Sequence, residues 1–220
     1  MHTTPGVLVE LLNLPQGSSQ EWSDWYDHTY LKARAQIPGV VAARRGSGVV
    51  GSVQNIVVYD LSDFLIPYGA DWVDVDRTMA VQSPVPSGLT EPLAAIDSLV
   101  YRQIFSADAG DYHPEVTEIL HGAFFEVESR DQDEFNDWYN SEHIEFIKTV
   151  EGYLNCRRFQ AYEKPSKFVA LYDVVSLANS EVKDAAGPNF SPWAVRVRAK
   201  LATYSERRLF QIERREQGQR

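Results

Sequence analysis

The sequence is poor in cysteine and in positive charge. The single thiol, that of Cys156, can form neither an intrachain disulfide nor a cysteine-based zinc site, and we expect a reducing cytoplasm as its setting. Lysine and arginine number 21 against 31 aspartate and glutamate residues, so the net charge is −10. Such a surface repels phosphate groups, which excludes nucleic acid as an expected partner.

Long apolar runs and the common catalytic motifs are also missing. No apolar run approaches the roughly 20 residues needed to span a bilayer, and residues 1–6 do not read as a signal peptide, so we expect no membrane partner. There is no glycine-rich phosphate-binding motif, no G-x-S-x-G and no H-E-x-x-H. Because His113, His121 and His143 show no recognised metal-ligand spacing, we expect no metal and no cofactor.

The sequence is rich in apolar and aromatic residues, and it repeats. Apolar residues fill 44% of the 220 positions, which is enough for one large domain or two of about 110 residues. The segment Glu21-x-x-Asp24-Trp25-Tyr26 recurs as Glu134-x-x-Asp137-Trp138-Tyr139, a shift of 113 residues. The same shift maps three further segments: Gly39 onto Gly152, Arg44-Arg45 onto Arg157-Arg158, and Tyr59-Asp60 onto Tyr172-Asp173. We interpret the chain as a tandem duplication.

The repeat gives the expected boundaries. The first copy covers residues 5–107 and the second covers 118–214, while the small and polar residues of 108–117 are typical of a linker. If a loop differs by three residues, Val7–Leu11 also matches Ala123–Val127.

Each copy predicts the order strand, helix, strand, strand, helix, strand. In the first copy we expect strands at 6–12, 40–46, 56–61 and 98–105, a helix from a capping box at Ser18 to Gly39, and a second helix at Ala70–Val81. In the second copy we expect strands at 121–128, 153–160, 169–174 and 204–212, a helix from a capping box at Asp131 to Gly152, and a second helix capped by Ser191.

This order is the split βαβ, ferredoxin-like arrangement, so the fold class is α+β. A lone unit of this kind would leave one apolar face of its four-stranded sheet exposed. We therefore expect two tandem units packed sheet to sheet, as an intramolecular dimeric α/β barrel. Whether two chains pair further as a homodimer stays open.

The first helix of the second copy carries a family likeness. Trp138-Tyr139-Asn140-Ser141-Glu142-His143, followed by Glu151-Gly152 and Arg157-Arg158, resembles the dimeric α/β-barrel superfamily and, within it, the EthD-like group. The resemblance implies that the histidine is the usual polar residue of a cavity between helix and sheet. The superfamily includes oxygenases, isomerases, cyclases, dehydratases and haem enzymes, so it implies a fold rather than one reaction.

Helical spacing points to His143 as the main candidate for catalysis. Phe135, Tyr139, His143 or its neighbour Glu142, Phe146 and Val150 recur every three or four residues and predict a buried stripe. An unperturbed imidazole titrates at about pH 6.5 and can give or take a proton, and Tyr139 could be its partner. A core histidine bonded to backbone is the alternative interpretation.

The first copy departs at that position, where Tyr30 replaces the histidine and His28 falls on the outer face of the helix. We expect a degenerate site there that uses Tyr30 and Tyr26. The substrate-binding residues that we expect in addition are aromatic or basic: Trp25, Trp138, Phe125, His121, Phe146, Arg157 and Arg158. For each of them a purely structural role is the alternative, including pairing of an inward arginine with Glu10 or Glu126.

Four functional hypotheses follow. The first is a cofactor-independent lyase, dehydratase, cyclase or isomerase that uses His143 for acid–base chemistry on a small apolar, aromatic or cyclic substrate. The second is a cofactor-free monooxygenase of a phenol or quinol. The third is a haem-binding protein, and the fourth is a non-catalytic binding module.

Overall fold

The computed structural model describes residues 3–13, 19–82, 97–107, 117–180, 191–201 and 205–218. Ser18, the proline-rich segment 83–92 and residues 108–116 of the predicted linker lie outside these ranges. The chain divides into two compact units. Unit 1 comprises Met1–Arg102 with Ile212–Arg220, and unit 2 comprises Gln103–Gln211.

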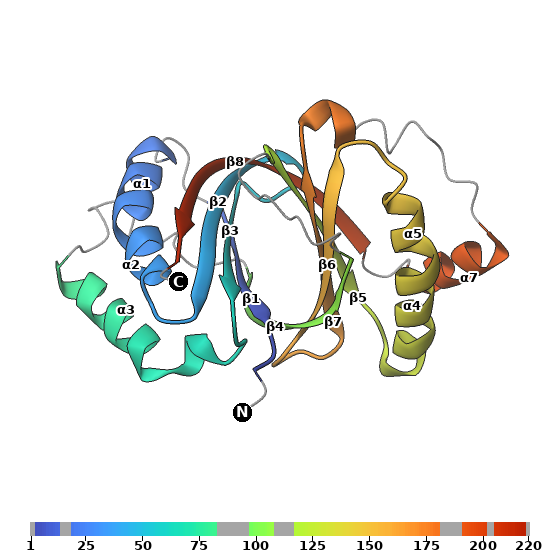
Figure 1. Cartoon of the computed structure of the whole chain (residues 1–220), viewed down its shortest axis with the longest axis horizontal. Helices are drawn as coiled ribbons and strands as arrows, with labels where there is room; N and C mark the ends of the chain where they lie inside the picture. The colour runs from blue at the N-terminus through green and yellow to red at the C-terminus, as the bar shows by residue number, and fades with distance from the viewer. Residues whose placement is uncertain are drawn as a thin grey trace. The chain divides into compact units, whose positions relative to one another are not determined.

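Unit 1 has a sheet with helices against one of its faces (Figure 1). Its elements are β1 (Gly6–Leu12), α1 (Ser19–Tyr26), the π-helical turn η1 (Asp27–Leu31), α2 (Lys32–Ala35), β2 (Val40–Val50), β3 (Asn55–Leu61), η2 (Ile66–Tyr68) and α3 (Ala70–Gln82). β1 lies between β3 and β4 (Asp97–Ser106), and β3 also pairs with β2, all antiparallel. Every residue of β3 is buried, so both faces of this strand are covered.

Unit 2 repeats the same order of elements. They are β5 (Ile119–Glu126), η4 (Ser129–Asp131), α4 (Gln132–Trp138), the π-helical turn η5 (Tyr139–His143), α5 (Ile144–Ile147), β6 (Tyr153–Ala161), β7 (Lys167–Val174), α7 (Pro192–Lys200) and β8 (Ser205–Gln217). β5 pairs with β7 and β8, and β6 pairs with β7, again antiparallel. Figure 1 shows α4 and α5 against one face of this sheet.

Two strands belong to both units. β4 begins in unit 1 and ends in unit 2, and β8 does the reverse. The hydrogen-bonded strand order is therefore β1-β3-β2-β8-β5-β7-β6-β4, which closes on itself as a barrel. The α+β class and the repeated ferredoxin-like order that the sequence predicts are thus confirmed.

The sequence located most elements but not all of their ends. α3 and the Ser191 cap of α7 agree with the prediction, and the Ser191 hydroxyl accepts the backbone N–H of Ala194 at 3.0 Å. The predicted cap at Asp131 is wrong, because that side chain makes no capping bond and pairs instead with Lys200 at 2.7 Å. β8 continues to Gln217, five residues past the predicted end.

Glycine ends the first long helical segment in each unit. Gly39 has a φ of 91° and Gly152 a φ of 86°, a left-handed conformation that side chains disfavour. One residue later each second strand begins with an irregular register, between Val40 and Ala42 and between Tyr153 and Asn155. These features recur at the 113-residue shift.

The same shift also holds for the first strands, which corrects the three-residue loop difference expected from sequence. Glu10 pairs with Val57, and Ala123 pairs with Ala170. Since Val57 and Ala170 are 113 residues apart, the counterpart of Glu10 is Ala123 and not Glu126. Sequence comparison missed this register because β1 and β5 share no identical residue in it.

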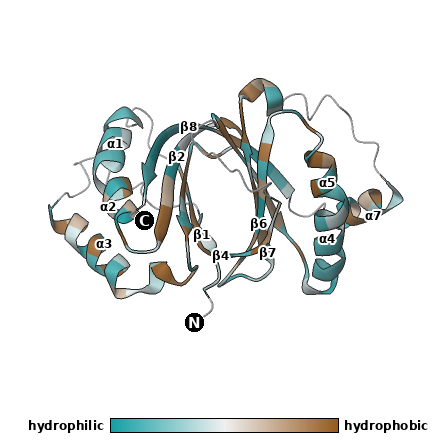
Figure 2. Cartoon of the chain, viewed as in Figure 1, coloured by the Kyte–Doolittle hydropathy of each residue, from teal (hydrophilic) through white to brown (hydrophobic). Residues whose placement is uncertain are grey.

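Each unit has its own apolar core between helices and sheet. The first is centred on Trp22, Tyr26, Leu31 and Tyr59, and the second on Phe135, Tyr139, Ile144 and Tyr172. Figure 2 shows hydrophobic positions in brown along the strands, whereas α1 and α4 are mostly teal. Within the described ranges no helix is long and apolar enough to cross a membrane.

Candidate functional site

A π-helical turn interrupts the long helix of each unit, at η1 and at η5. A π turn holds an extra residue, so the positions after it are rotated by about 100° relative to an uninterrupted α-helix. In unit 2 this rotation turns Ile144 and Ile147 toward the core and leaves Phe146 41% exposed. The prediction that Phe146 lies on the buried stripe is therefore wrong, whereas its role in binding a substrate stays a prediction.

Two buried tyrosines lie at the centre of the unit 2 cluster. The hydroxyls of Tyr139, on η5, and Tyr172, on β7, form a hydrogen bond, and both side chains are fully buried. Phe125 contacts Tyr139 edge-on at 5.6 Å between ring centroids. Burial raises the pKa of both hydroxyls well above the ordinary value, so both stay protonated at neutral pH.

His143 lies next to this tyrosine pair and is half-buried. Its ring is 4.6 Å from the ring of Tyr139, edge-on, and 5.1 Å from that of Trp138. The imidazole is thus held between two aromatic side chains and keeps part of its surface accessible.

His121 reaches the same cluster from β5. It is 1% exposed, stacks on Tyr172 at 4.9 Å between ring centroids, and its Nδ1 lies 3.0 Å from the hydroxyl of Tyr153. His121 of β5 and His143 of η5 are therefore brought to the same tyrosine pair.

Arg158 lies beneath the pair on β6, and burial lowers the pKa of its guanidinium. Its guanidinium carbon is 4.2 Å from the ring centroid of Tyr139. It donates to the Oδ1 atoms of Asn140 at 2.5 Å and Asn136 at 2.8 Å. The alternative pairing with Glu126 is wrong, because Glu126 is exposed and contacts Ser166. Arg157 alternates to the other face of β6 and is half-buried.

Glu142 is a contact that the sequence reading missed. Its carboxylate accepts the indole N–H of Trp138 at 3.0 Å and the hydroxyl of Ser191 at 2.7 Å. It therefore ties the start of α7 to the helix that carries His143. The capping signal at Ser191 locates the start of α7 from the sequence, but it does not indicate this long-range bond to Glu142.

Unit 1 has a related but ion-paired cluster. The hydroxyls of Tyr26 and Tyr59 are 2.9 Å apart, and Tyr26 donates to Glu10 at 2.7 Å. Arg34 bonds both Glu10, at 3.2 Å, and Asp76, at 2.9 Å. Burial raises the pKa of Tyr59 to about 12 and that of Tyr26 well above its usual value. The predicted pairing of Glu10 with a strand-two arginine is wrong, since its partner comes from α2.

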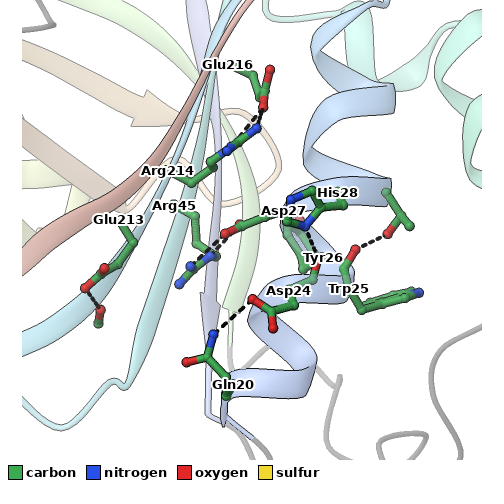
Figure 3. A network of polar contacts seen from close by, with 12 residues as sticks. Gln20, Asp24, Trp25, Tyr26, Asp27, His28, Arg45, Glu213, Arg214 and Glu216 are labelled. Atoms are coloured by element: carbon green, nitrogen blue, oxygen red, sulfur yellow. Dashed lines mark hydrogen bonds and ion pairs between the residues drawn. The ribbon is translucent and has the colours of Figure 1, made fainter.

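Aromatic residues of unit 1 surround Tyr30, which is half-buried. Its ring is 5.1 Å from that of Trp25 and 6.1 Å from that of Tyr26. His28 is exposed, as expected, and its Nδ1 lies 2.7 Å from the backbone carbonyl of Asp24 (Figure 3). Tyr30 thus occupies the surroundings that His143 has in unit 2, without an ionisable imidazole.

The arginines of β2 lie on opposite faces, but both are buried. Arg45 forms two bonds with Asp27 of η1, the shorter at 2.6 Å, as Figure 3 shows. Arg44 pairs with Asp60 on the other face at 3.2 Å. Both arginines of this strand are thus held in internal ion pairs.

No group of three or more metal-ligating side chains occurs among the described residues. In that part of the chain the groups around His143 and the tyrosine pair are aromatic rings, phenols, imidazoles, amides, the Cys156 thiol, the Glu142 carboxylate and the guanidinium groups of Arg158 and Arg198. Such a set can move protons and stabilise an oxyanion near an aromatic ring.

No family model and no curated protein matches the sequence. Among solved structures, the chain is similar to an anthrone oxidase-like protein with a TM-score of 0.70 and 14% identity, over 100% of this chain and 95% of that one. A Fusobacterium nucleatum protein provisionally named a monooxygenase gives a TM-score of 0.70 and 11% identity, over 99% and 96%. A Listeria monocytogenes ferredoxin-fold protein related to antibiotic biosynthesis monooxygenases gives 0.51 and 9%, over 97% and 96%. At these identities the likeness shows the dimeric α/β-barrel fold alone.

Proposed function

We propose that unit 2 carries the active site of a cofactor-independent enzyme that deprotonates a small aromatic or cyclic substrate. The observation that carries the proposal is the half-buried His143, held between Trp138 and Tyr139 beside a buried hydroxyl pair. An imidazole can act as a base near neutral pH, and aromatic walls suit a planar substrate.

In this mechanism His143 takes a proton from the substrate and returns it at another position or to a leaving group. Trp138 and Phe125 contact the substrate ring, and the Tyr139–Tyr172 pair donates a hydrogen bond to the oxygen on which negative charge develops. Lyase, dehydratase, cyclase and isomerase reactions all share this first step. His121 and Arg158 support the tyrosines from below.

The first step can be tested without the natural substrate. Anthrone has a CH2 group whose deprotonation gives an aromatic anion, and its uptake of deuterium from deuterated buffer under argon reports proton transfer alone. We expect His143→Phe to slow the catalysed exchange by about 100-fold or more while the fold persists. His28→Phe, at an exposed histidine of unit 1, is the control that should keep the rate. Full exchange by His143→Phe would refute the proposal.

A second candidate is a cofactor-free monooxygenase, which is favoured by the names of two structures of similar fold. The deprotonated substrate would itself reduce oxygen: a CH2 group and O2 would give a carbonyl group and water, with one oxygen atom in each product. One O2 consumed per product, measured with an oxygen electrode, would select this candidate over an isomerase or a lyase.

The 113-residue shift supports a further part of the proposal, that the chain arose by tandem duplication within the EthD-like group. It relates the glycines, the strand registers and the two tyrosine pairs. We place the enzyme in the cytoplasm, with a small apolar or aromatic substrate. The homodimer and the haem-binding alternative stay predictions, which sedimentation equilibrium and the visible spectrum of the purified protein would test.

A further inference from the structure

The two units have one strand register but different charges at corresponding positions. In unit 1, Glu10 pairs with Val57, which pairs with Arg45. In unit 2 the same row reads Ala123, Ala170 and Arg158. Because each residue is shifted by 113 positions, a side chain of one row can be compared directly with its counterpart in the other.

In unit 1 each of the two guanidinium groups, those of Arg34 and Arg45, pairs with a carboxylate of the protein. The Glu10 carboxylate accepts the Tyr26 hydroxyl and pairs with Arg34 of α2. The Asp27 carboxylate of η1 pairs with Arg45. Asp76 of α3 also pairs with Arg34, so three carboxylates face the two guanidinium groups, and the hydroxyl pair donates to an oxygen anion that belongs to the protein.

In unit 2 three of the four corresponding residues have lost their charge. Ala123 replaces Glu10, Ile147 replaces Arg34 and Asn140 replaces Asp27, which leaves Arg158 alone. Arg158 is 1% exposed, and across the described ranges its polar partners are the neutral amide oxygens of Asn140 and Asn136. A buried guanidinium without a carboxylate is costly, and an anion nearby would offset that cost.

A small side chain stands at the position of the missing carboxylate. Ala123 lies on the helix-facing side of β5, and its small side chain is partly exposed. In unit 1 the carboxylate at this position receives the hydrogen bond of the tyrosine pair. The Tyr139–Tyr172 pair is preserved in unit 2, whereas the carboxylate that accepts from Tyr26, the counterpart of Tyr139, is replaced by the methyl group of Ala123.

We propose that unit 2 binds its substrate as an oxyanion, a phenolate or an enolate, whose charged oxygen takes the place that the Glu10 carboxylate holds in unit 1. This inference rests on the proposed function, since such an anion is what deprotonation of the substrate produces. Arg158 acts as a positioning residue: it stabilises the anion through Tyr139. The other ionisable groups around the tyrosine pair are His121, His143, Cys156, Arg198 and Glu142.

The test uses 4-nitrophenol, whose anion absorbs visible light and whose neutral form does not. Titration of the probe with and without the full-length protein gives the affinity of each form. We expect the wild type to bind the anion more tightly than the neutral phenol. Asn140→Asp, which installs the carboxylate that unit 1 has, should reduce this preference by about tenfold or more.

Matched variants separate charge from size. Ala123→Glu supplies the missing carboxylate and should abolish the preference for the anion, whereas Ala123→Gln, of the same size without charge, should keep the preference even if both forms bind more weakly. Asp27→Asn in unit 1 should leave the preference unchanged. If Ala123→Glu does not fold, Asn140→Asp decides alone.

Equal binding of both forms by the wild type, no detectable binding, or an unchanged preference in Asn140→Asp would overturn the inference. These outcomes are distinct from failure of the proposed function. A lost preference together with His143-dependent exchange would refute only the oxyanion site. A retained preference together with exchange that does not need His143 would refute only the proposed function.

Discussion

At the scale of single residues, the two units differ at positions where their folds agree. Tyr30 and His143 have similar aromatic neighbours, with ring centroids 5.1 Å from the preceding tryptophan in both units, yet only His143 can exchange a proton near neutral pH. Asp27 and Asn140 each bind the arginine of the second strand, yet only Asp27 neutralises it. One substitution at each position thus separates an ion-paired cluster from a candidate active site.

The Asp27–Arg45 ion pair gives a residue-scale prediction for stability. Both side chains are buried, so Asp27→Ala leaves a guanidinium without its counter-charge and should lower the free energy of unfolding by about 3 kcal/mol. Urea denaturation followed by circular dichroism measures the change. Asp24→Ala, on the exposed face of the same helix, should stay within about 0.5 kcal/mol of wild type. A loss below about 1 kcal/mol for Asp27→Ala would show that the pair is not stabilising.

Sequence reasoning at this scale succeeded for Tyr139 and His143 within the π turn and for the buried Val150, and failed for Phe146. Tyr139 lies in the core and His143 beside it, as the helical spacing predicts, whereas Phe146 is exposed. A prediction from helical spacing uses 3.6 residues per turn throughout the helix. The residue types of Tyr139–His143 do not indicate that this segment forms a π turn with one extra residue. The ion pairs of Glu10 and Arg34 were missed because they join elements that only the fold brings together.

At the scale of elements, the capping of α7 couples a helix end to the candidate site. Ser191 accepts the N–H of Ala194 and donates to Glu142, which also holds the indole of Trp138. Local signals at Ser191 and Pro192 predicted this helix start correctly because the bonds that cap a helix lie within four residues. The predicted cap at Asp131 does not form because the Asp131 carboxylate pairs with Lys200, which is distant in the sequence.

Removing the Ser191 hydroxyl should therefore weaken the start of α7. Ser191→Ala is expected to lower the free energy of unfolding by about 1 kcal/mol, since one backbone N–H loses its acceptor. Thermal denaturation measures this loss. Ser141→Ala, whose hydroxyl bonds only a carbonyl within its own helix, is the control and should change little. Equal stability of both variants would mean that the cap does not support α7.

At the scale of the whole molecule, β4 and β8 each contribute to both units, so neither sheet is complete without a strand that continues into the other. The sequence predicted the repeated order of elements because apolar periodicity and turn residues are local. It did not predict that β8 would run to Gln217, because the pairing of its last residues with β2 depends on distant parts of the chain.

Four buried tyrosines predict how the molecule responds to alkali. Burial raises the pKa of Tyr26, Tyr59, Tyr139 and Tyr172, with Tyr59 at about 12. In the unfolded chain a tyrosine releases its proton at a pH of about 10, so the unfolded state binds fewer protons above that pH. The stability that these groups contribute is complete below about pH 10 and is lost as the pH rises toward 12.

This loss can be followed by tyrosinate absorbance and circular dichroism during one alkaline titration. We expect the last tyrosines to ionise together with unfolding, and Tyr59→Phe to make stability less dependent on pH between 10 and 12. Complete ionisation at about pH 10 with an unchanged fold would contradict the burial of these hydroxyls.

The central claim is that the two units share a fold but only unit 2 moves protons. Deuterium uptake by the aromatic ketone probe under argon, compared for His143→Phe and for Tyr30→Phe at the corresponding position of unit 1, tests this claim most directly. The account predicts that His143→Phe loses the catalysed exchange by about 100-fold or more and that Tyr30→Phe retains it. Equal rates in the two variants, or a loss confined to Tyr30→Phe, would contradict it.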